Sequence, residues 1–161
     1  MTSGNEKKSK EMRLLVAIDF SDCARGALRQ AKLLLSEKPA HIIALHVIDH
    51  DFIAECIRHN LDDEGEIKKK LFLEAKAKLK DFLSQENIEN NQVKMIVIEG
   101  IPFIEINKMA VENNVDMVII GSCGETGGMS ELFFGSTTEK VLRFITRPVL
   151  CVPPRSQYRM G

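Results

Sequence analysis

The sequence lacks the features that would place the protein in a membrane or on a nucleic acid. None of its 161 residues belongs to an apolar run of the ~18–20 residues needed to cross a bilayer. The polar segment 1–11 leads into no signal-type apolar stretch. Lysine and arginine nearly balance aspartate and glutamate, which leaves a formal net charge of −1 and no field that favours a polyanion. We therefore expect a cytoplasmic protein with neither nucleic acid nor membrane as a partner.

The sequence also lacks the cysteine and histidine spacings of metal and redox motifs. No C-x-x-C or zinc-finger pair occurs among the four cysteines, which are Cys23, Cys56, Cys123 and Cys151. In a cytoplasmic chain, scattered cysteines are ordinarily reduced, so we expect four free thiols. His46 and His50 lie four residues apart across the end of an expected strand and have no third ligand at a fixed spacing. The sequence therefore predicts no metal site.

Apolar residues make up 44% of the chain, enough for a packed core, and they alternate between two periodicities. Short, nearly continuous apolar runs predict five strands, at residues 12–18, 41–48, 93–98, 116–120 and 149–152. Apolar residues at helical spacing predict helices at 23–36, 67–84, 103–113 and 136–146, with a shorter helical piece at 52–59. This alternation indicates a doubly wound α/β fold: a five-stranded, mostly parallel sheet with helices on both faces. We expect a single domain at 12–153, between tails at 1–11 and 154–161.

Polar residues and apolar faces add detail to these helices. Ser21 can cap the helix that follows the first strand, and Asn113-Asn114 can end the helix before the fourth strand, since asparagine tolerates a left-handed cap. The helical pattern places Ile104, Met109 to Val111 and Phe144 on inward faces.

A glycine-rich segment at residues 121–136 stands out between the fourth strand and the last helix. It holds five of the ten glycines of the chain, at positions 121, 124, 127, 128 and 135. Glycine allows positive φ and lets a ligand approach the backbone closely. At its end, Ser136-Thr137-Thr138-Glu139 fits a capping box and predicts a helix start, whose free N–H groups would favour an anion such as phosphate. The alternative is a long surface loop in which the glycines only make turns.

The expected fold places this segment beside two other strand ends. In doubly wound sheets, ligands bind beyond the carboxyl ends of the strands, where the strand order reverses. The first strand ends at Ala17-Ile18-Asp19, the second at Val47-Ile48-Asp49, and the glycine-rich segment follows the fourth. These three features predict one cleft.

The motifs, in this order and spacing, resemble the universal stress protein family over nearly the whole chain from Met12 to Val152. They are VAIDFS at residues 16–21, LHVID at 45–49, EGIP at 99–102, DMVIIGS at 116–122, GSTTEKVL at 135–142 and RPVLCV at 147–152. Family members that bind ATP share a G-x2-G-x9-G-S/T loop. Here Gly121 and Gly124 match its first half and Gly135-Ser136 its second, but the spacer at 125–134 has ten residues, one more than the pattern.

The resemblance implies an adenine nucleotide site. Asp19 would hold adenine or ribose, the backbone of Val47 would meet adenine, and Gly121 and Gly124 would let the chain pass close to ribose and phosphates. Backbone N–H groups and hydroxyls at 135–137 would meet the phosphates. The full set of expected nucleotide-binding residues is Ala17, Ile18, Asp19, Val47, Ile120, Gly121, Cys123, Gly124, Gly135, Ser136 and Thr137. The expected ligand is ATP, with Mg²⁺ where the nucleotide brings it. For Asp19 the plain alternative is an acidic residue between a strand and a helix cap.

Two functions follow from the resemblance, and two further classes receive little support. The first is an ATP-binding regulator or sensor of the stress response, and the second is a nucleotide-free dimeric interaction module, which the longer spacer favours. We expect no catalytic residue because no general base or nucleophile is evident, although slow ATP hydrolysis or self-phosphorylation stays open. An adenylating enzyme would carry an S-G-G-x-D-S loop where residues 19–23 stand, and a dehydrogenase would carry G-x-G-x-x-G. The family implies a homodimer, formed through the last strand.

Overall fold

The computed structural model describes residues 10–37, 39–89, 91–123 and 134–154. Five strands in this part of the chain form one sheet in the order β3-β2-β1-β4-β5, and every neighbouring pair is parallel. They are β1 (Met12–Ala17), β2 (Ala40–Asp49), β3 (Val93–Gly100), β4 (Met117–Gly121) and β5 (Val149–Val152). The predicted α/β class and five-stranded sheet are confirmed, and the sheet is parallel throughout. Most of the two predicted tails lies outside the described residues.

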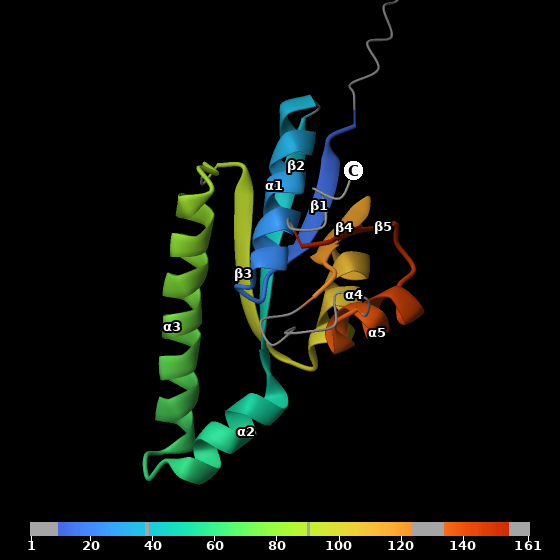
Figure 1. Cartoon of the computed structure of the whole chain (residues 1–161). Coiled ribbons are helices and arrows are strands. Elements are labelled where there is room, and N and C mark those ends of the chain that lie inside the picture. Colours follow the sequence, from blue (N-terminus) through green and yellow to red (C-terminus); the bar gives the residue numbers. More distant parts are fainter. Residues whose placement is uncertain (1–9, 38, 90, 124–133, 155–161) are drawn as a thin grey trace, which may run out of the picture.

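Helices cover both faces of the sheet (Figure 1). They are α1 (Asp22–Glu37), α2 (His50–His59), α3 (Glu64–Gln85), α4 (Pro102–Glu112) and α5 (Ser136–Phe144). One buried cluster joins α1 and α3 to one face of the sheet through residues that include Leu28, Leu79 and Ile119. The other joins α4 and α5 to the opposite face, around Ala110, Val118 and Val141. The arrangement is therefore doubly wound, with one apolar layer on each face of the sheet.

The central strands are buried on both faces, as their continuous apolar runs predict. Leu14, Leu15 and Val16 of β1 are fully buried, and so are Val118 and Ile119 of β4. At the edge of the sheet, by contrast, Met95 of β3 is exposed, and among the described strands β3 pairs with β2 alone.

Three apolar side chains do not lie where the helical pattern placed them. Ile104 and Val111 of α4 and Phe144 of α5 are exposed, whereas Ile106, Ala110 and Val141 fill the core below them. The pattern was wrong at these positions because α4 and α5 each present a narrow apolar stripe to the sheet. The ring of Phe144 lies against that of Phe103, with their centroids 5.7 Å apart, so the two helices share an apolar contact near the surface.

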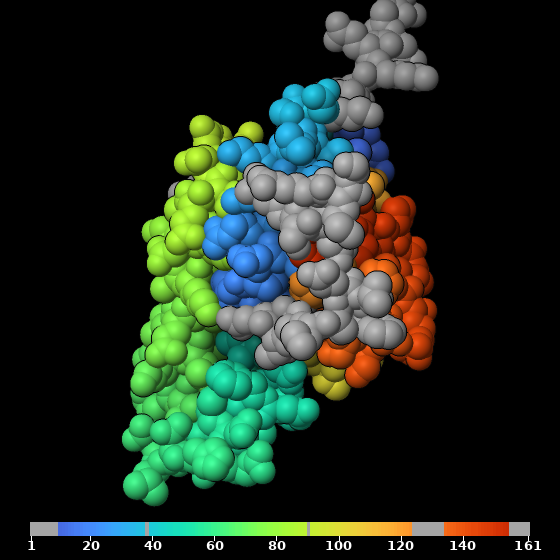
Figure 2. Space-filling model, in the orientation of Figure 1, coloured from blue at the N-terminus to red at the C-terminus, as the bar shows by residue number. Residues whose placement is uncertain are grey.

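The segment between β2 and β3 is more helical than its sequence indicated. It forms α2 and the 22-residue α3, which extend past the carboxyl ends of the strands (Figures 1 and 2). A small buried cluster of Ile48, Ile53 and Ala75 joins the two helices to β2. Asp49 and Asp63 cap α2 and α3 by accepting hydrogen bonds from Asp51 and Gly65, and these caps explain starts two or three residues earlier than predicted. Within the described residues, no helix is long and apolar enough to cross a membrane.

A carboxylate ties the end of α3 to α1. Glu86, whose side chain is 9% exposed, accepts hydrogen bonds from Arg25 and Arg29 at 2.8–3.2 Å. Its backbone oxygen accepts another from Lys32, with an N–O distance of 2.8 Å. Burial raises the pKa of Glu86, but the hydrogen bonds and charges of Arg29 and Arg25 outweigh it, so the net shift is downward from 4.5. Glu86 is therefore ionised at neutral pH and fastens α3 to α1.

Candidate functional site

The strand order reverses beside β1, and a cavity lies at this place. From β1 the chain first adds β2 and β3 on one side of the sheet, and then β4 and β5 on the other. A cavity of about 260 Å³ opens beyond the carboxyl ends of these strands. Its lining comes from the ends of β1, β2 and β4 and from the starts of α1, α4 and α5. Such a switch in strand order is where doubly wound sheets bind ligands.

The cavity brings together ten of the eleven residues that the sequence singles out for nucleotide binding. These ten are Ala17, Ile18, Asp19, Val47, Ile120, Gly121, Cys123, Gly135, Ser136 and Thr137. Gly124 and residues 125–133 of the ten-residue spacer lie outside the described residues. Their predicted role in nucleotide binding stays a prediction, since the structure contains no ligand.

The lining also includes six residues that the sequence did not single out for binding, namely Ser21, Ala24, Leu45, Pro102, Ile106 and Thr138. Pro102 and Ile106 come from α4, which starts directly after β3. The EGIP motif at 99–102 was visible in the sequence, but only the sheet order shows that α4 covers the cavity. Ser21 was assigned to the helix cap alone, although it performs that role and lines the cavity as well.

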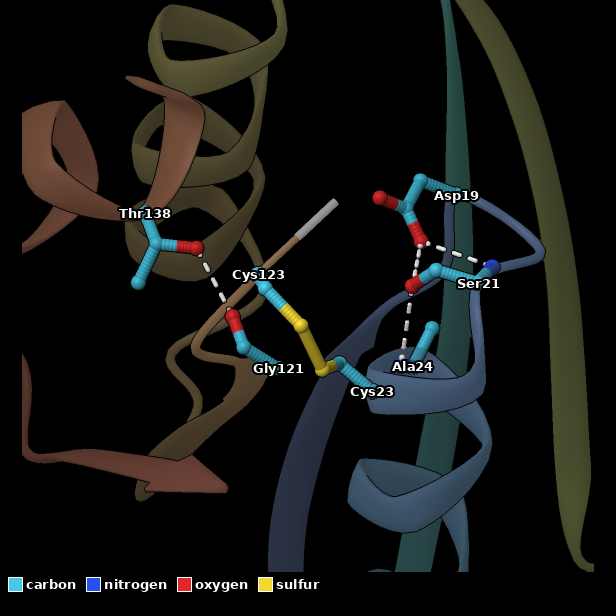
Figure 3. The surroundings of a disulfide bond; sticks show 7 residues. All are labelled: Asp19, Ser21, Cys23, Ala24, Gly121, Cys123 and Thr138. Carbon is cyan, nitrogen blue, oxygen red and sulfur yellow. Dashed lines mark hydrogen bonds between the residues drawn. A yellow bond between two sulfur atoms is a disulfide. The ribbon is translucent and has the colours of Figure 1, made fainter. Parts of the chain in front are cut away.

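Asp19 and Ser21 form a hydrogen-bonded turn on one side of the cavity (Figure 3). The Asp19 Oδ1 atom accepts hydrogen bonds from the backbone N–H of Ser21, at 3.0 Å, and from the Ser21 hydroxyl. Ser21 Oγ in turn accepts from the backbone N–H of Ala24 at 3.1 Å, which confirms Ser21 as the cap of α1. Among the described residues, only Oδ1 of Asp19 accepts hydrogen bonds, so Oδ2 can accept from a further donor.

Phe20, between these two residues, has a left-handed backbone. Its φ of 67° is uncommon for a bulky residue and turns its ring away from the cavity lining. The ring packs against His46 and Phe82, with centroids 4.5 and 5.7 Å away, while the Lys78 ammonium lies 4.6 Å from its centroid. The imidazole of His46 also donates from Nδ1 to the Ile18 carbonyl at 2.7 Å. This packing holds the turn that presents Asp19.

The first glycine of the G-x2-G segment packs directly on α1. A Cβ at Gly121 would lie 2.6 Å from the Cβ of Cys23 and 2.7 Å from its carbonyl carbon, closer than real Cβ contacts. Glycine is therefore required here by the backbone of α1 and not by a turn. The next amide, Ser122 N–H, donates to the Val152 carbonyl, and Ser122 O accepts from Gly135 N–H at 2.9 Å. The two ends of the glycine-rich segment thus lie side by side.

The start of α5 differs from the predicted capping box. The helix begins at Ser136 as expected, but Gly135 is its cap residue and makes no side-chain bond, so Ser136 does not cap the helix. Thr138 Oγ1 instead donates to the Gly121 carbonyl at 2.7 Å, and Glu139 pairs with Arg143 one turn along the helix. The predicted box was wrong because Gly135 takes the cap position that the box assigns to Ser136, and Glu139 pairs with Arg143 instead of reaching back to the helix start. The first amides of α5 consequently have no side-chain cap and face the cavity lined by residues 135–138.

A disulfide joins Cys23 of α1 to Cys123, whose Cα atoms lie 5.9 Å apart (Figure 3). The expectation of four free thiols is therefore wrong for this pair, while Cys56 and Cys151 are free. The spacing rule failed because the partners are 100 residues apart and only the contact between α1 and β4 brings them together. Burial raises the pKa of the Cys151 thiol, which makes it less reactive. No group of three metal-ligating side chains occurs among the described residues.

Comparison with known proteins places this chain in a family. The model of the universal stress protein family matches residues 12–153. The chain belongs to the universal stress protein family. It is 35% identical to universal stress protein MJ0577 of Methanocaldococcus jannaschii over 152 residues, which cover 87% of this chain and 93% of that protein. It is 32% identical to universal stress protein YxiE of Bacillus subtilis over 156 residues, covering 87% and 97%.

Solved structures of the family share the fold. The structure of MJ0577 matches with a TM-score of 0.74 at 37% identity and covers 88% of this chain and 94% of that one. Two more distant structures were solved with nucleotides, a universal stress protein in complex with cAMP and one from Archaeoglobus fulgidus in complex with dAMP. Their TM-scores are 0.59 and 0.57, at 18% and 21% identity, with 89% and 88% of this chain and 98% and 97% of theirs covered. At these identities the likeness concerns the fold alone.

Proposed function

We propose that the protein binds ATP in the cavity between β1 and β4 and acts as a regulator or sensor of the stress response in the cytoplasm. The observation that carries the proposal is the convergence of a carboxylate, an apolar wall and an uncapped helix start on one cavity at the switch in strand order. Binding of adenine nucleotides by family members, seen with cAMP and dAMP, supports the choice of ligand.

Each part of ATP has a matching part of the cavity. Ala17, Leu45 and Ile106 offer an apolar wall to adenine beside the backbone of Val47. The Oδ2 atom of Asp19 can accept from ribose hydroxyls, since its partner oxygen already accepts from Ser21. The N-terminus of the nine-residue α5 directs free N–H groups and the positive end of its dipole at the phosphates.

The cavity favours binding over fast chemistry. Among the described residues, Asp19 is the only carboxylate that lines the cavity. No described histidine or lysine lines the cavity to serve as a general base. This arrangement suits a protein that responds to nucleotide occupancy. Slow hydrolysis is a further outcome that the purified protein can be assayed for.

Titration of ATP and Mg²⁺ into the purified protein by calorimetry tests the proposal. We expect saturable binding of ATP, with ADP, AMP and cAMP as comparisons and GTP as the specificity control. Acid extraction of freshly purified protein should release an adenine nucleotide. If no nucleotide is extracted and no adenine nucleotide gives heat, the nucleotide-free interaction module is the better description.

A matched pair of variants tests the position of the phosphates. Ser136→Glu adds a negative charge at the first residue of α5, where we expect ATP affinity to fall at least about tenfold through like-charge repulsion. A glutamate at this position is favourable for the helix itself, so lost binding cannot be ascribed to an unfolded α5. Thr146→Glu adds the same charge on an exposed position beyond the other end of α5 and should leave affinity nearly unchanged. Equal affinities in the two variants would contradict the placement.

A further inference from the structure

The Cys23–Cys123 disulfide connects the two sides of the cavity. Cys23 lies in the first turn of α1, on the side that carries Asp19 and Ser21. Cys123 follows β4, on the side that carries Gly121 and Thr138, and it lines the cavity itself (Figure 3). The bond thus lies at the ligand site and not in a remote part of the fold.

Other contacts hold the two cysteines close, whether or not the bond is formed. Gly121 packs against the backbone of Cys23, and the Gly121 carbonyl accepts the hydrogen bond from Thr138. Ser122 N–H donates to Val152 at 2.8 Å, which fixes the residue just before Cys123. A Cα separation of 5.9 Å is also ordinary for a disulfide. Reduction therefore leaves two neighbouring thiols that can join again.

The two sulfur atoms differ in access. Cys23 is 2% exposed, whereas Cys123 is half-buried and faces the cavity. A small disulfide or thiol can thus reach Cys123 but not Cys23, which makes Cys123 the residue that exchanges with solution and Cys23 the residue that resolves the mixed disulfide. In cytoplasmic proteins, disulfides are usually transient or redox-sensing, which fits an exchange site better than a permanent cross-link.

We propose that Cys23 and Cys123 form a reversible thiol–disulfide exchange site that couples the ligand cavity to low-molecular-weight thiols and disulfides. The thiolate of Cys123 attacks one sulfur of a small disulfide such as oxidised glutathione, its S–S bond breaks, and one glutathione leaves as a thiol. The thiolate of Cys23 then attacks the Cys123 sulfur and releases the second glutathione. The protein loses two electrons and two protons, and one oxidised glutathione becomes two reduced molecules.

The disulfide form is the form that binds the ligand more tightly. The bond holds the side chain of Cys123, which forms part of the cavity wall after β4, against α1 before a ligand arrives. In the reduced form the backbone contacts keep Cys123 near α1, but its side chain gains freedom to rotate. Ordering that side chain on binding costs entropy, which lowers affinity. This consequence rests on the proposed binding of ATP, whereas the exchange chemistry and the ordering of the wall do not.

Equilibration in mixtures of reduced and oxidised glutathione, followed by acid quenching, alkylation and mass spectrometry of peptides, tests the exchange. We expect Cys23 and Cys123 to be protected together in one two-electron transition. Cys56→Ser and Cys151→Ser should keep this transition, and Cys23→Ser should remove it and leave Cys123 as a mixed disulfide with glutathione. Absence of a Cys23–Cys123 peptide at every glutathione ratio would overturn the proposal.

Amide hydrogen exchange and nucleotide titration of the oxidised and reduced forms test the coupling. In the oxidised form we expect amides at residues 22–25 and 121–123 to exchange at least about threefold more slowly and ATP to bind at least about threefold more tightly. Equal amide exchange in the two forms overturns the coupling. If neither form binds any nucleotide but amide exchange differs, the proposed function fails while the exchange site and its effect on the wall stand. If ATP binds equally to both forms, the proposed function stands and the effect on affinity is overturned.

Discussion

Ser21 is a single residue on which the cap of a helix and the position of a carboxylate both depend. Its hydroxyl accepts from the Ala24 amide and donates to Asp19. We expect Ser21→Ala to lower the free energy of unfolding by about 1 kcal/mol, the usual cost of losing such a cap. The same change removes one of the two hydrogen bonds that hold Asp19 Oδ1 and leaves only the one from the backbone N–H, so ATP affinity should fall as well. Urea denaturation and calorimetry measure the two effects.

Ser21→Thr is the matched control because threonine keeps the hydroxyl. We expect it to restore most of the stability and the affinity. Should Ser21→Ala and Ser21→Thr behave alike in both measurements, the hydroxyl would have neither role, and the buried position of Ser21 would matter only for packing.

Single residues show where the sequence was informative about the site and where it was not. Asp19 and Gly121 follow apolar runs, and the ends of parallel strands meet at one edge, so their meeting could be predicted. The disulfide could not be predicted, because nothing local in the sequence relates Cys23 to Cys123. The role of Thr138 was also hidden, since the local sequence indicates where the helix starts but not that Thr138 meets the Gly121 carbonyl, 17 residues away.

At the scale of elements, Glu86 decides how firmly α3 is held on α1. Its pKa is lowered from 4.5, so its contribution to stability is present above that value and is lost as the pH falls through the lower pKa of the folded state. We expect Glu86→Gln to lower the free energy of unfolding by about 1–2 kcal/mol near pH 7, a modest figure because Arg29 is partly exposed. The difference from the unmodified protein should shrink as the pH falls below 4.5.

Urea denaturation of both proteins over this pH range measures the effect. Glu89→Gln is the control, because Glu89 is exposed and lies three residues beyond Glu86. A stability difference for Glu86→Gln that stays the same from neutral to acidic pH would show that the ionised form of the carboxylate is not what holds α3.

Helices and strands were predictable where buried apolar residues follow one another or recur at a regular spacing along the chain. The continuous apolar runs of β1, β2 and β4 indicate strands buried on both faces, and the sheet confirms them. The α2 segment was predicted only as a short piece because few of its residues are buried and Ile53 alone is fully so. The exposed positions of Ile104 and Phe144 show the same limit. Periodicity indicates which face of a helix is apolar, but the packing of neighbouring elements determines how much of that face is buried.

At the scale of the whole molecule, the sheet has two edges that differ in character. The edge strand β3 has eight residues and carries Lys94 and an exposed Met95, whereas β5 has four residues with the sequence VLCV. Charged residues such as lysine discourage pairing at an edge, while a wholly apolar edge strand invites a partner or a cover. We therefore expect a homodimer that forms through β5, as the resemblance to the family also implies.

Light scattering on Leu150→Lys and Met95→Lys distinguishes the two edges. Each variant places a lysine on one edge strand, and we expect only Leu150→Lys to shift the mass from dimer towards monomer. Leu150 also packs partly against the core next to α1, so circular dichroism must first show that the variant keeps its helices and strands. A monomeric unmodified protein, or a dimer lost only in Met95→Lys, would contradict pairing through β5. The outcome bears on the cavity too. Val152 of β5 accepts a hydrogen bond from Ser122, which lies between the lining residues Gly121 and Cys123, so a partner on this edge would brace the same wall that the disulfide fixes.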